Sequence, residues 1–505
     1  MFWPMHWPTE LRRSARRKSG RGSGGAGRFR APLFAVAVEP KPLLAVLAVL
    51  CPLVAGCLPR EKKEPRLPIS VLVSGDTQGW IVPCGCTSNQ SGGMLRRGTL
   101  LSELRHQRDV VYVDVGGAAS GTSRYDRMKF EAILAGEKQM RVAAHNVGAS
   151  EAALGADYLR DAGRRLAVPW VSCNVRDASG KPVADPLRIV TAGGRRLAFV
   201  GVLSDRLNIN GLSIGPPRES ISAVLREGQE PFDAVIVLAY LAEDELRQLA
   251  GDLPEAHVIV GGPTGQAMTP CRVGPVLLTS ATNKAKFLVK LDVAENDAAA
   301  SWNGDLVELN SQFVDNPRQR ENLTRFYDAL AAADLSATDT SFARTLPASV
   351  PRDYRIAGDA SCRECHPEDS ERCVQMRHAR AWAALEQRGA NVDPYCQQCH
   401  TNGYGLPGGF LSLRQSRSLV NVGCESCHGP SLAHQRDSKL RTPNFRRAEQ
   451  RCTSCHDREN SPEFAYEKYW KQIRHGEPAR KVTDPAIGPP SNVREGEAAN
   501  GIKDH

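Results

Sequence analysis

The sequence has no uninterrupted apolar run long enough to cross a membrane. Its longest such run, Leu43 to Gly56, falls short of the roughly 20 residues that a spanning helix needs. No second hydrophobic span follows it. We therefore expect the chain beyond this run to be soluble and to lie outside the cytoplasm, provided that the run belongs to an export signal.

The chain also has little net charge outside its N-terminal segment. The formal net charge is +9, but residues 1–56 hold nine Lys/Arg against two Asp/Glu, so only +2 remains for the rest. The basic balance therefore gives no reason to expect a nucleic-acid partner.

The N-terminal segment has the pattern of an export signal. Nine basic residues precede the apolar run, and small residues end it in Leu53-Val-Ala-Gly-Cys57. This ending resembles the lipobox of bacterial lipoproteins, which implies that Cys57 is the lipidated first residue of the mature chain. We expect a signal segment over 1–56, a polar linker over 57–68, and attachment to the periplasmic or cell-surface face of a bacterial membrane. An uncleaved anchor is the alternative.

Four copies of one short motif lie in the C-terminal part. They are Cys362-Arg-Glu-Cys365-His366, Cys396-Gln-Gln-Cys399-His400, Cys424-Glu-Ser-Cys427-His428 and Cys452-Thr-Ser-Cys455-His456. In a C-x-x-C-H motif the two thiols bond the vinyl groups of one porphyrin, and the imidazole becomes the proximal iron ligand. A zinc-ribbon array is the alternative, but it does not require His directly after every second Cys. The motifs predict four c-type haems.

Three further histidines in this region are candidates for the distal iron ligands: His378, His434 and His475. A free surface histidine is the alternative for each of them. Four irons with three distal candidates predict one haem that is five-coordinate or carries water, unless Met376, His505 or a partner chain supplies the missing ligand. Such an open haem can bind a small ligand such as nitric oxide.

Five cysteines remain once the signal, the lipid and the haems have taken theirs: Cys84, Cys86, Cys173, Cys271 and Cys373. An oxidising compartment favours disulfides among them. The first four are also candidates for a thiolate metal site, because we expect them near one rim of the N-terminal domain. Unconnected thiols are the alternative.

The N-terminal part, residues 69–315, alternates β-type apolar runs with helical stretches. The helical stretches include Gly93–His106 and Glu243–Ala250. The expected strands are Ile69–Ser74, Val110–Asp114, Trp170–Ser172, Leu197–Val202, Ala234–Ala239, His257–Val260, Val276–Thr279 and Phe287–Val293.

This part resembles the calcineurin-like metallophosphatases, in particular their 5′-nucleotidase branch. The likeness rests on Asp76-Thr-Gln-Gly79, Gly92-Gly93, Val113-Asp114-Val-Gly-Gly117, Gly155-Ala-Asp157, Ala239-Tyr240 and Gly261-Gly-Pro263-Thr-Gly265. It implies an α+β fold, a β-sandwich flanked by helices.

The departures from that family concern its metal ligands. The motif histidines are replaced by Gln78, Asp157, Tyr240, Pro263 and Gly265, and one motif Asp by Gly117. Asp76 and Asp114 alone cannot hold the two ions that clamp an in-line displacement. We expect the fold without phosphatase chemistry, although the loops could still bind a partner or a small ligand.

Residues 316–352 read as a connector. Asn316-Pro317 starts a helix, and Leu323, Phe326, Tyr327 and Leu330 fall on one apolar face. The following Asp334 to Pro351 is rich in Ala, Ser, Thr and Pro, which favours a flexible link. We expect a haem domain over 353–480, built of short helices and loops around porphyrin, and a tail over 481–505.

The haem domain resembles the tetrahaem cytochromes c that accept electrons from hydroxylamine oxidoreductase. The resemblance rests on Asp393-Pro-Tyr-Cys396, Gly408-Gly-Phe410, Val422 to Pro430 and Cys455 to Pro462. It implies three bis-His haems and one open haem, the second along the chain, which corresponds to His400. Cys373 departs from the family, where an aromatic residue is more usual.

The sequence therefore predicts an extracytoplasmic, lipid-anchored electron carrier between unidentified donor and acceptor proteins. One alternative is a reductase of nitric oxide, or of another small nitrogen or oxygen species, at the open haem. A redox-controlled phosphoesterase is a second alternative, and a docking role for the N-terminal domain is a third.

Overall fold

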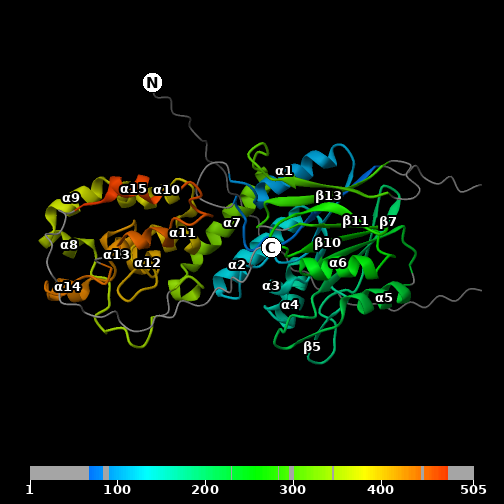
Figure 1. Cartoon of the computed structure of the whole chain (residues 1–505), viewed down its shortest axis with the longest axis horizontal. Helices are drawn as coiled ribbons and strands as arrows, with labels where there is room; N and C mark the ends of the chain where they lie inside the picture. Colours follow the sequence, from blue (N-terminus) through cyan, green and yellow to red (C-terminus); the bar gives the residue numbers. More distant parts are fainter. Residues whose placement is uncertain are drawn as a thin grey trace, which may run out of the picture. The chain divides into compact units, whose positions relative to one another are not determined.

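The computed structural model of the chain (Figure 1) describes residues 68–83, 90–228, 230–281, 284–294, 301–343, 346–444 and 448–475. The predicted signal segment, the lipidated Cys57, most of the linker, Cys84, Cys86 and the tail lie outside these ranges. Within the described residues, no helix has both the length and the apolar character that crossing a membrane requires.

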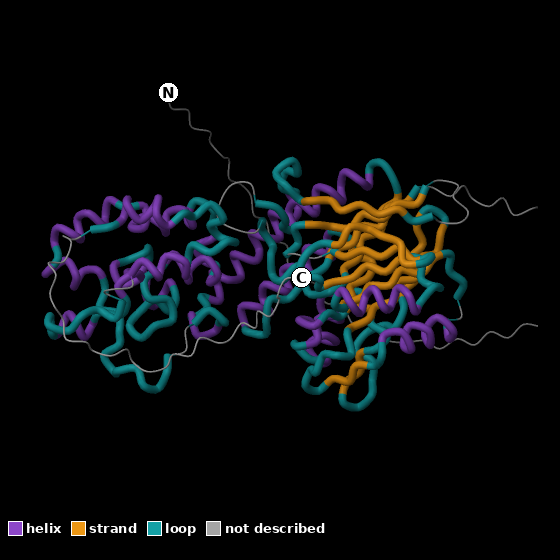
Figure 2. The backbone as a smooth tube through the Cα atoms, viewed as in Figure 1, coloured by secondary structure: helices purple, strands orange, loops and turns teal. Residues whose placement is uncertain are grey.

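Two six-stranded mixed sheets form the N-terminal half (Figure 2). The first sheet has the order β14-β13-β1-β2-β3-β4, in which β1 to β4 are parallel and β13 is antiparallel to both of its neighbours, β1 and β14. Its strands are β1 (Ile69–Ser74), β2 (Asp109–Asp114), β3 (Val142–Asn146), β4 (Trp170–Val171), β13 (Phe287–Val293) and β14 (Asn303–Glu308).

The second sheet has the order β11-β12-β10-β9-β7-β6, with antiparallel strands at both edges. Its strands are β6 (Arg188–Ala192), β7 (Arg195–Leu203), β9 (Ala234–Tyr240), β10 (Val258–Gly262), β11 (Met268–Val273) and β12 (Val276–Ser280). An antiparallel pair of short strands, β5 (Val175–Asp177) and β8 (Leu212–Ile214), forms a separate two-stranded sheet.

The two sheets share one core, and helices cover their other faces. Side chains alternate across a strand, so Phe199 of β7 packs into the core between the sheets, while Val200 faces a second cluster. That second cluster contains side chains of α5 (Pro217–Glu227) and α6 (Glu243–Asp252). The first sheet is packed by α1 (Met94–Arg105) and α2 (Arg124–Gln139), and the short α3 (Ala149–Ala152) and α4 (Ala156–Leu166) follow β3.

The eight expected strands are confirmed, and β1 and β13 have the predicted bounds. The apolar runs of these strands are long enough to be seen in the sequence alone. Strand β3 was not expected, because its buried end carries the polar pair His145-Asn146.

The connector begins with α7 (Pro317–Ala333), which starts at the Asn316 cap as expected and buries Phe326 and Leu330. The prediction of a flexible link after it is wrong for residues 334–343. Leu335 and Ala337 are buried, and the Ala337 N–H donates to the Leu411 carbonyl over 2.8 Å. This segment packs because its few apolar residues meet the cluster around Phe410.

The C-terminal region consists of short helices and loops, as expected. Its helices are η1 (Ala337–Asp339), α8 (Asp359–Cys365), α9 (Pro367–Gln375), η2 (Arg377–Arg380), α10 (Ala381–Glu386), η3 (Ala390–Val392), α11 (Pro394–His400), α12 (Leu413–Ser416), η4 (Arg417–Leu419), α13 (Cys424–His428), α14 (Leu432–Arg436), η5 (Ala448–Ser454) and α15 (Tyr466–Ile473). Its described apolar clusters are small and centre on Phe410 and Trp382. Side chains alone therefore provide little core here.

Candidate functional site

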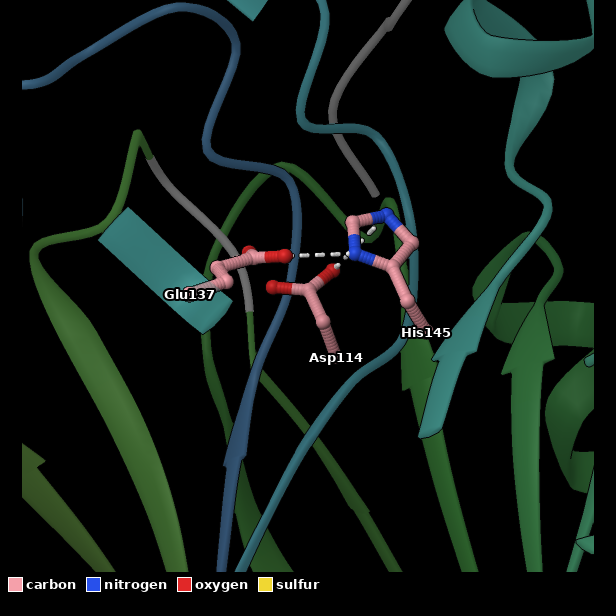
Figure 3. A group of neighbouring side chains, drawn as sticks. All are labelled: Asp114, Glu137 and His145. Carbon is pink, nitrogen blue, oxygen red and sulfur yellow. Dashed lines mark hydrogen bonds and ion pairs between the residues drawn. The ribbon is translucent and has the colours of Figure 1, made fainter. Parts of the chain in front are cut away.

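The N-terminal half holds a buried charge network at the C-terminal ends of β2 and β3 (Figure 3). Asp114 ends β2, Glu137 lies on α2 and His145 lies on β3, and each of these side chains is fully buried. The His145 Nδ1 and a Glu137 oxygen are 2.7 Å apart. Burial acts to lower the pKa of His145, but Glu137 and Asp114 outweigh it and raise this pKa well above its usual range.

Arg97 of α1 balances this network. Its guanidinium lies 3.9 Å from Asp114 and 3.8 Å from Glu137, and donates to the hydroxyls of Tyr112 (2.8 Å) and Thr77 (3.0 Å). Asp114, Glu137 and His145 are close enough together to be considered as ligands of one metal ion. The guanidinium supplies positive charge beside these carboxylates, which is consistent with an internal ion network, although Arg97 Nε, Glu137 Oε1 and His145 Nε2 are buried without a hydrogen-bond partner.

The carboxylate of Glu151, a residue of α3, reaches the loop in which Gly117 stands at the place of a motif aspartate. Its carboxylate accepts the backbone N–H groups of Gly117 (2.8 Å) and Ala118 (2.6 Å). Tyr240 leaves no room for a larger side chain at Gly117, because a Cβ there would lie 2.7 Å from its ring. The buried Glu151 carboxylate and the Tyr240 ring therefore fill the space around Gly117.

The expectation that Asp157 stands at the position of a motif histidine is wrong, because its side chain is not part of this site. Strand β3 ends at Asn146, so the loop that enters the site is Val147–Gly148, followed by Glu151. Asp157 lies on α4 with a fully exposed side chain. The sequence did carry a signal for Glu151, an acidic residue shortly after a strand, but only the register of β3 identifies it.

Cys173 and Cys271 do not share one rim. The Cys173 N–H donates to Gly201 of β7 over 2.8 Å, whereas Cys271 lies on β11. Strands β12, β10 and β9 separate β11 from β7, and four steps of about 4.8 Å place the two cysteines roughly 15–20 Å apart. They can share neither a metal ion nor a disulfide.

In the C-terminal region, helical turns arrange the four C-x-x-C-H motifs. The first three lie on α8, α11 and α13, and the fourth begins in the last residues of η5. Residues i, i+3 and i+4 of a helix lie on one face, so both thiols and the imidazole of a motif are presented to the same side. This is the arrangement that attachment of one porphyrin requires.

Three motif histidines face three other histidines. The ring centroids are 6.1 Å apart for His366 and His434, 6.1 Å for His456 and His378, and 5.8 Å for His428 and His475. A metal–imidazole bond is about 2 Å long, so two imidazoles on opposite sides of one ion have centroids about 6 Å apart. The three pairs therefore fit an iron between their rings. The non-motif histidines of these pairs are His434 on α14, His378 on η2 and His475 just after α15.

His400 has no such partner among the described residues. Its Nδ1 lies 2.8 Å from the Ala381 carbonyl, an acceptor, so Nδ1 carries the proton and Nε2 is left for a metal. His434 and His475 likewise have Nδ1 against a carbonyl, at 2.6 and 3.0 Å. Burial lowers the pKa of His400 and keeps its imidazole in the neutral form that ligates iron.

Cys373 lies between two motifs. Its thiol and that of Cys362 both make hydrogen-bond contacts with the Cys424 thiol. The thiol expected near the first motif therefore lies beside Cys424 of the third motif, and it is half-buried.

Comparison with known sequences identifies this region. The sequence profile of the family "Cytochrome c554 and c-prime" matches residues 361–429. The C-terminal region contains a cytochrome c554 domain. Cytochrome c-554 of Nitrosomonas europaea is 27% identical over 155 residues, which cover 24% of this chain and 66% of that protein, so the chain spans just under two thirds of its relative. The matched family is one of multihaem c-type cytochromes.

Solved structures resemble the N-terminal half. A 5′-nucleotidase precursor from Thermus thermophilus is similar with a TM-score of 0.47 and 22% identity, covering 54% of this chain and 60% of that one. The calcineurin-like phosphoesterase YfkN from Bacillus subtilis has a TM-score of 0.46 and 16% identity, covering 52% and 98%. These likenesses concern the fold alone.

Proposed function

We propose that this protein is an extracytoplasmic electron carrier with four c-type haems, three of them bis-His and one open. In this proposal the haems are attached to Cys362/Cys365, Cys396/Cys399, Cys424/Cys427 and Cys452/Cys455, with His366, His400, His428 and His456 as proximal ligands. His434, His378 and His475 are the distal ligands of the first, fourth and third haems. A lipid on Cys57 holds the chain at the membrane.

One observation carries the proposal: each of three motif histidines faces a non-motif histidine at the separation that a shared iron needs. Two strong imidazole ligands leave an iron no site for substrate, so such haems exchange electrons only. The haems when bound supply the redox chemistry. The chain would supply the imidazoles and the thiols that hold them, and burial lowers the pKa of His378, His400, His428 and His456, which favours their neutral, ligating form.

The second haem is the exception, since His400 lacks a facing histidine among the described residues. The Ala381 carbonyl orients the His400 ring, and a hydrogen-bond acceptor at Nδ1 makes an imidazole a stronger ligand through Nε2. An open haem could bind nitric oxide or a similar small species. Turnover at this haem would make the protein a reductase rather than a carrier.

Electron paramagnetic resonance of the ferric protein tests the proposal. We expect one high-spin signal for every three low-spin signals, and conversion of that signal to a nitrosyl species after reduction and addition of nitric oxide. Four low-spin haems with no nitrosyl would contradict the open site. Continuous nitric oxide consumption with a chemical reductant would favour the reductase.

The buried network of the N-terminal half argues against phosphoesterase activity. Arg97 provides the positive charge between its carboxylates, and Glu151 fills the loop at Gly117. We expect no phosphate release from nucleotides by the full-length protein at any ratio of added divalent metal. Metal-dependent hydrolysis that Asp76→Ala abolishes would overturn this expectation.

A further inference from the structure

The loop after β1 and the first turns of α2 form a rim of the N-terminal half, and this rim contacts the cytochrome c554 domain through Trp80, Tyr125 and Lys129. In α/β sheets, ligands bind beyond the carboxyl ends of the parallel strands. The loop after β1 carries Trp80 at this rim, and Tyr125 and Lys129 lie on the first turns of α2. All three contact the segment that leads into the second C-x-x-C-H motif.

Tyr125 holds the start of α11, the helix of the second motif. Its hydroxyl donates to Asp393 over 2.7 Å, and both residues are buried. Asp393 is the N-cap of α11, because the same oxygen accepts the Tyr395 N–H over 2.9 Å. Burial, together with the Asp393 charge, raises the pKa of Tyr125 well above its usual range, so the tyrosine remains a donor. One hydrogen-bond chain thus runs from α2 to the helix that presents Cys396.

Tyr395, the residue before Cys396, is surrounded by side chains that precede the haem domain. Trp80 meets its ring edge-on at a centroid distance of 5.5 Å, and Phe342 does so at 5.6 Å. The Lys129 ammonium lies 5.1 Å from the centre of the same ring. Edge-to-face and cation–π contacts are directional, so they fix the orientation of the ring as well as its position.

Tyr395 and the N-terminal half also contact the segment that follows the fourth C-x-x-C-H motif. Asn460 donates to the Tyr395 hydroxyl over 3.2 Å, and Lys284 forms an ion pair with Glu459. Both partners belong to the turn after His456, in which Asp457 accepts the N–H groups of Glu459 and Asn460. The rim therefore holds the segments of the second and fourth motifs together.

We propose that Tyr125 and Tyr395 are positioning residues for the second haem, and that the rim of the N-terminal half serves as an internal docking surface for the second and fourth haem segments. This inference rests on the proposed function, since it concerns the haems at His400 and His456. The N-terminal half then acts on electron transfer by fixing the geometry of this haem pair, not through a ligand of its own.

Tyr125→Phe in the full-length holoprotein tests the inference, because it removes only the hydroxyl. We expect the midpoint potential and the resonance signal of one haem, the open one, to shift, and electron transfer into it to slow about tenfold, as when a ligand-orienting group is lost. The other three haems should keep their potentials. Tyr158→Phe is the matched control, since its hydroxyl donates to Glu131 over 3.2 Å on α2.

Two outcomes separate this inference from the proposed function. A wild-type protein without an open haem contradicts the proposed function, while a Tyr125→Phe protein with the same four potentials and rates as wild type overturns the inference. If Tyr125→Phe does not accumulate with its haems, Lys129→Met provides the test. It removes the cation from the Tyr125 and Tyr395 rings and should shift the same haem alone. An unchanged second haem in that variant would equally overturn the inference.

Discussion

Replacing Arg97 by Met should destabilise the N-terminal half strongly. The Arg97 side chain has no exposed surface and lies within 4 Å of the carboxylates of Asp114 and Glu137. Methionine leaves these carboxylates buried without the guanidinium, and removing one partner of a buried ion pair costs about 3–5 kcal/mol. For a unit of roughly 250 residues, each kcal/mol lowers Tm by about 2–4 °C. The expected fall in Tm is therefore about 6–20 °C.

The assay is thermal unfolding followed by far-ultraviolet circular dichroism, which reports the two sheets, with the haem absorbance recorded in parallel. Arg247→Met is the matched control, because Arg247 makes an exposed ion pair at 2.7 Å with Glu243 on α6. Such exposed pairs contribute at most about 1 kcal/mol. A Tm of Arg97→Met no lower than that of Arg247→Met would refute the interpretation of the cluster as an ion network that depends on Arg97.

Three further predictions concern the histidines and the extra thiol. His434→Ala should open the first haem and raise the high-spin fraction from one haem in four to two, whereas the exposed His106→Ala should leave the spectrum unchanged; an unaltered spectrum for His434→Ala would disprove the pairing with His366. His145 has a pKa raised well above its usual range, so its stabilising charge is fully present below the unfolded pKa of about 6.5 and is lost as pH rises through the folded pKa. Urea unfolding should therefore show the largest destabilisation by His145→Gln near pH 6 and a smaller one under alkaline conditions; a loss that grows with pH would contradict this sign. Cys373→Ser should retain all four haems by intact-protein mass, and loss of a haem would show that this thiol has a part in attachment.

The sheets could be predicted where apolar runs were continuous, as for Ile69–Ser74 and Phe287–Val293. Prediction failed where burial depended on distant partners. The end of β3 is polar in sequence, yet His145 is buried because Glu137 of α2 lies beside it. The segment after α7 has the composition of a linker, yet Ala337 packs because Leu411 and Phe410 are brought to it.

The candidate site divides in the same way. The sequence by itself predicts the haem-attachment chemistry, because the two thiols and the imidazole of a C-x-x-C-H motif are neighbours in the chain and one helical turn puts them on one face. Only the tertiary structure decided which histidines face one another, and that Tyr125 of the N-terminal half reaches Asp393. These partners are tens to hundreds of residues apart, so their approach depends on the packing of the whole chain, which no local pattern records.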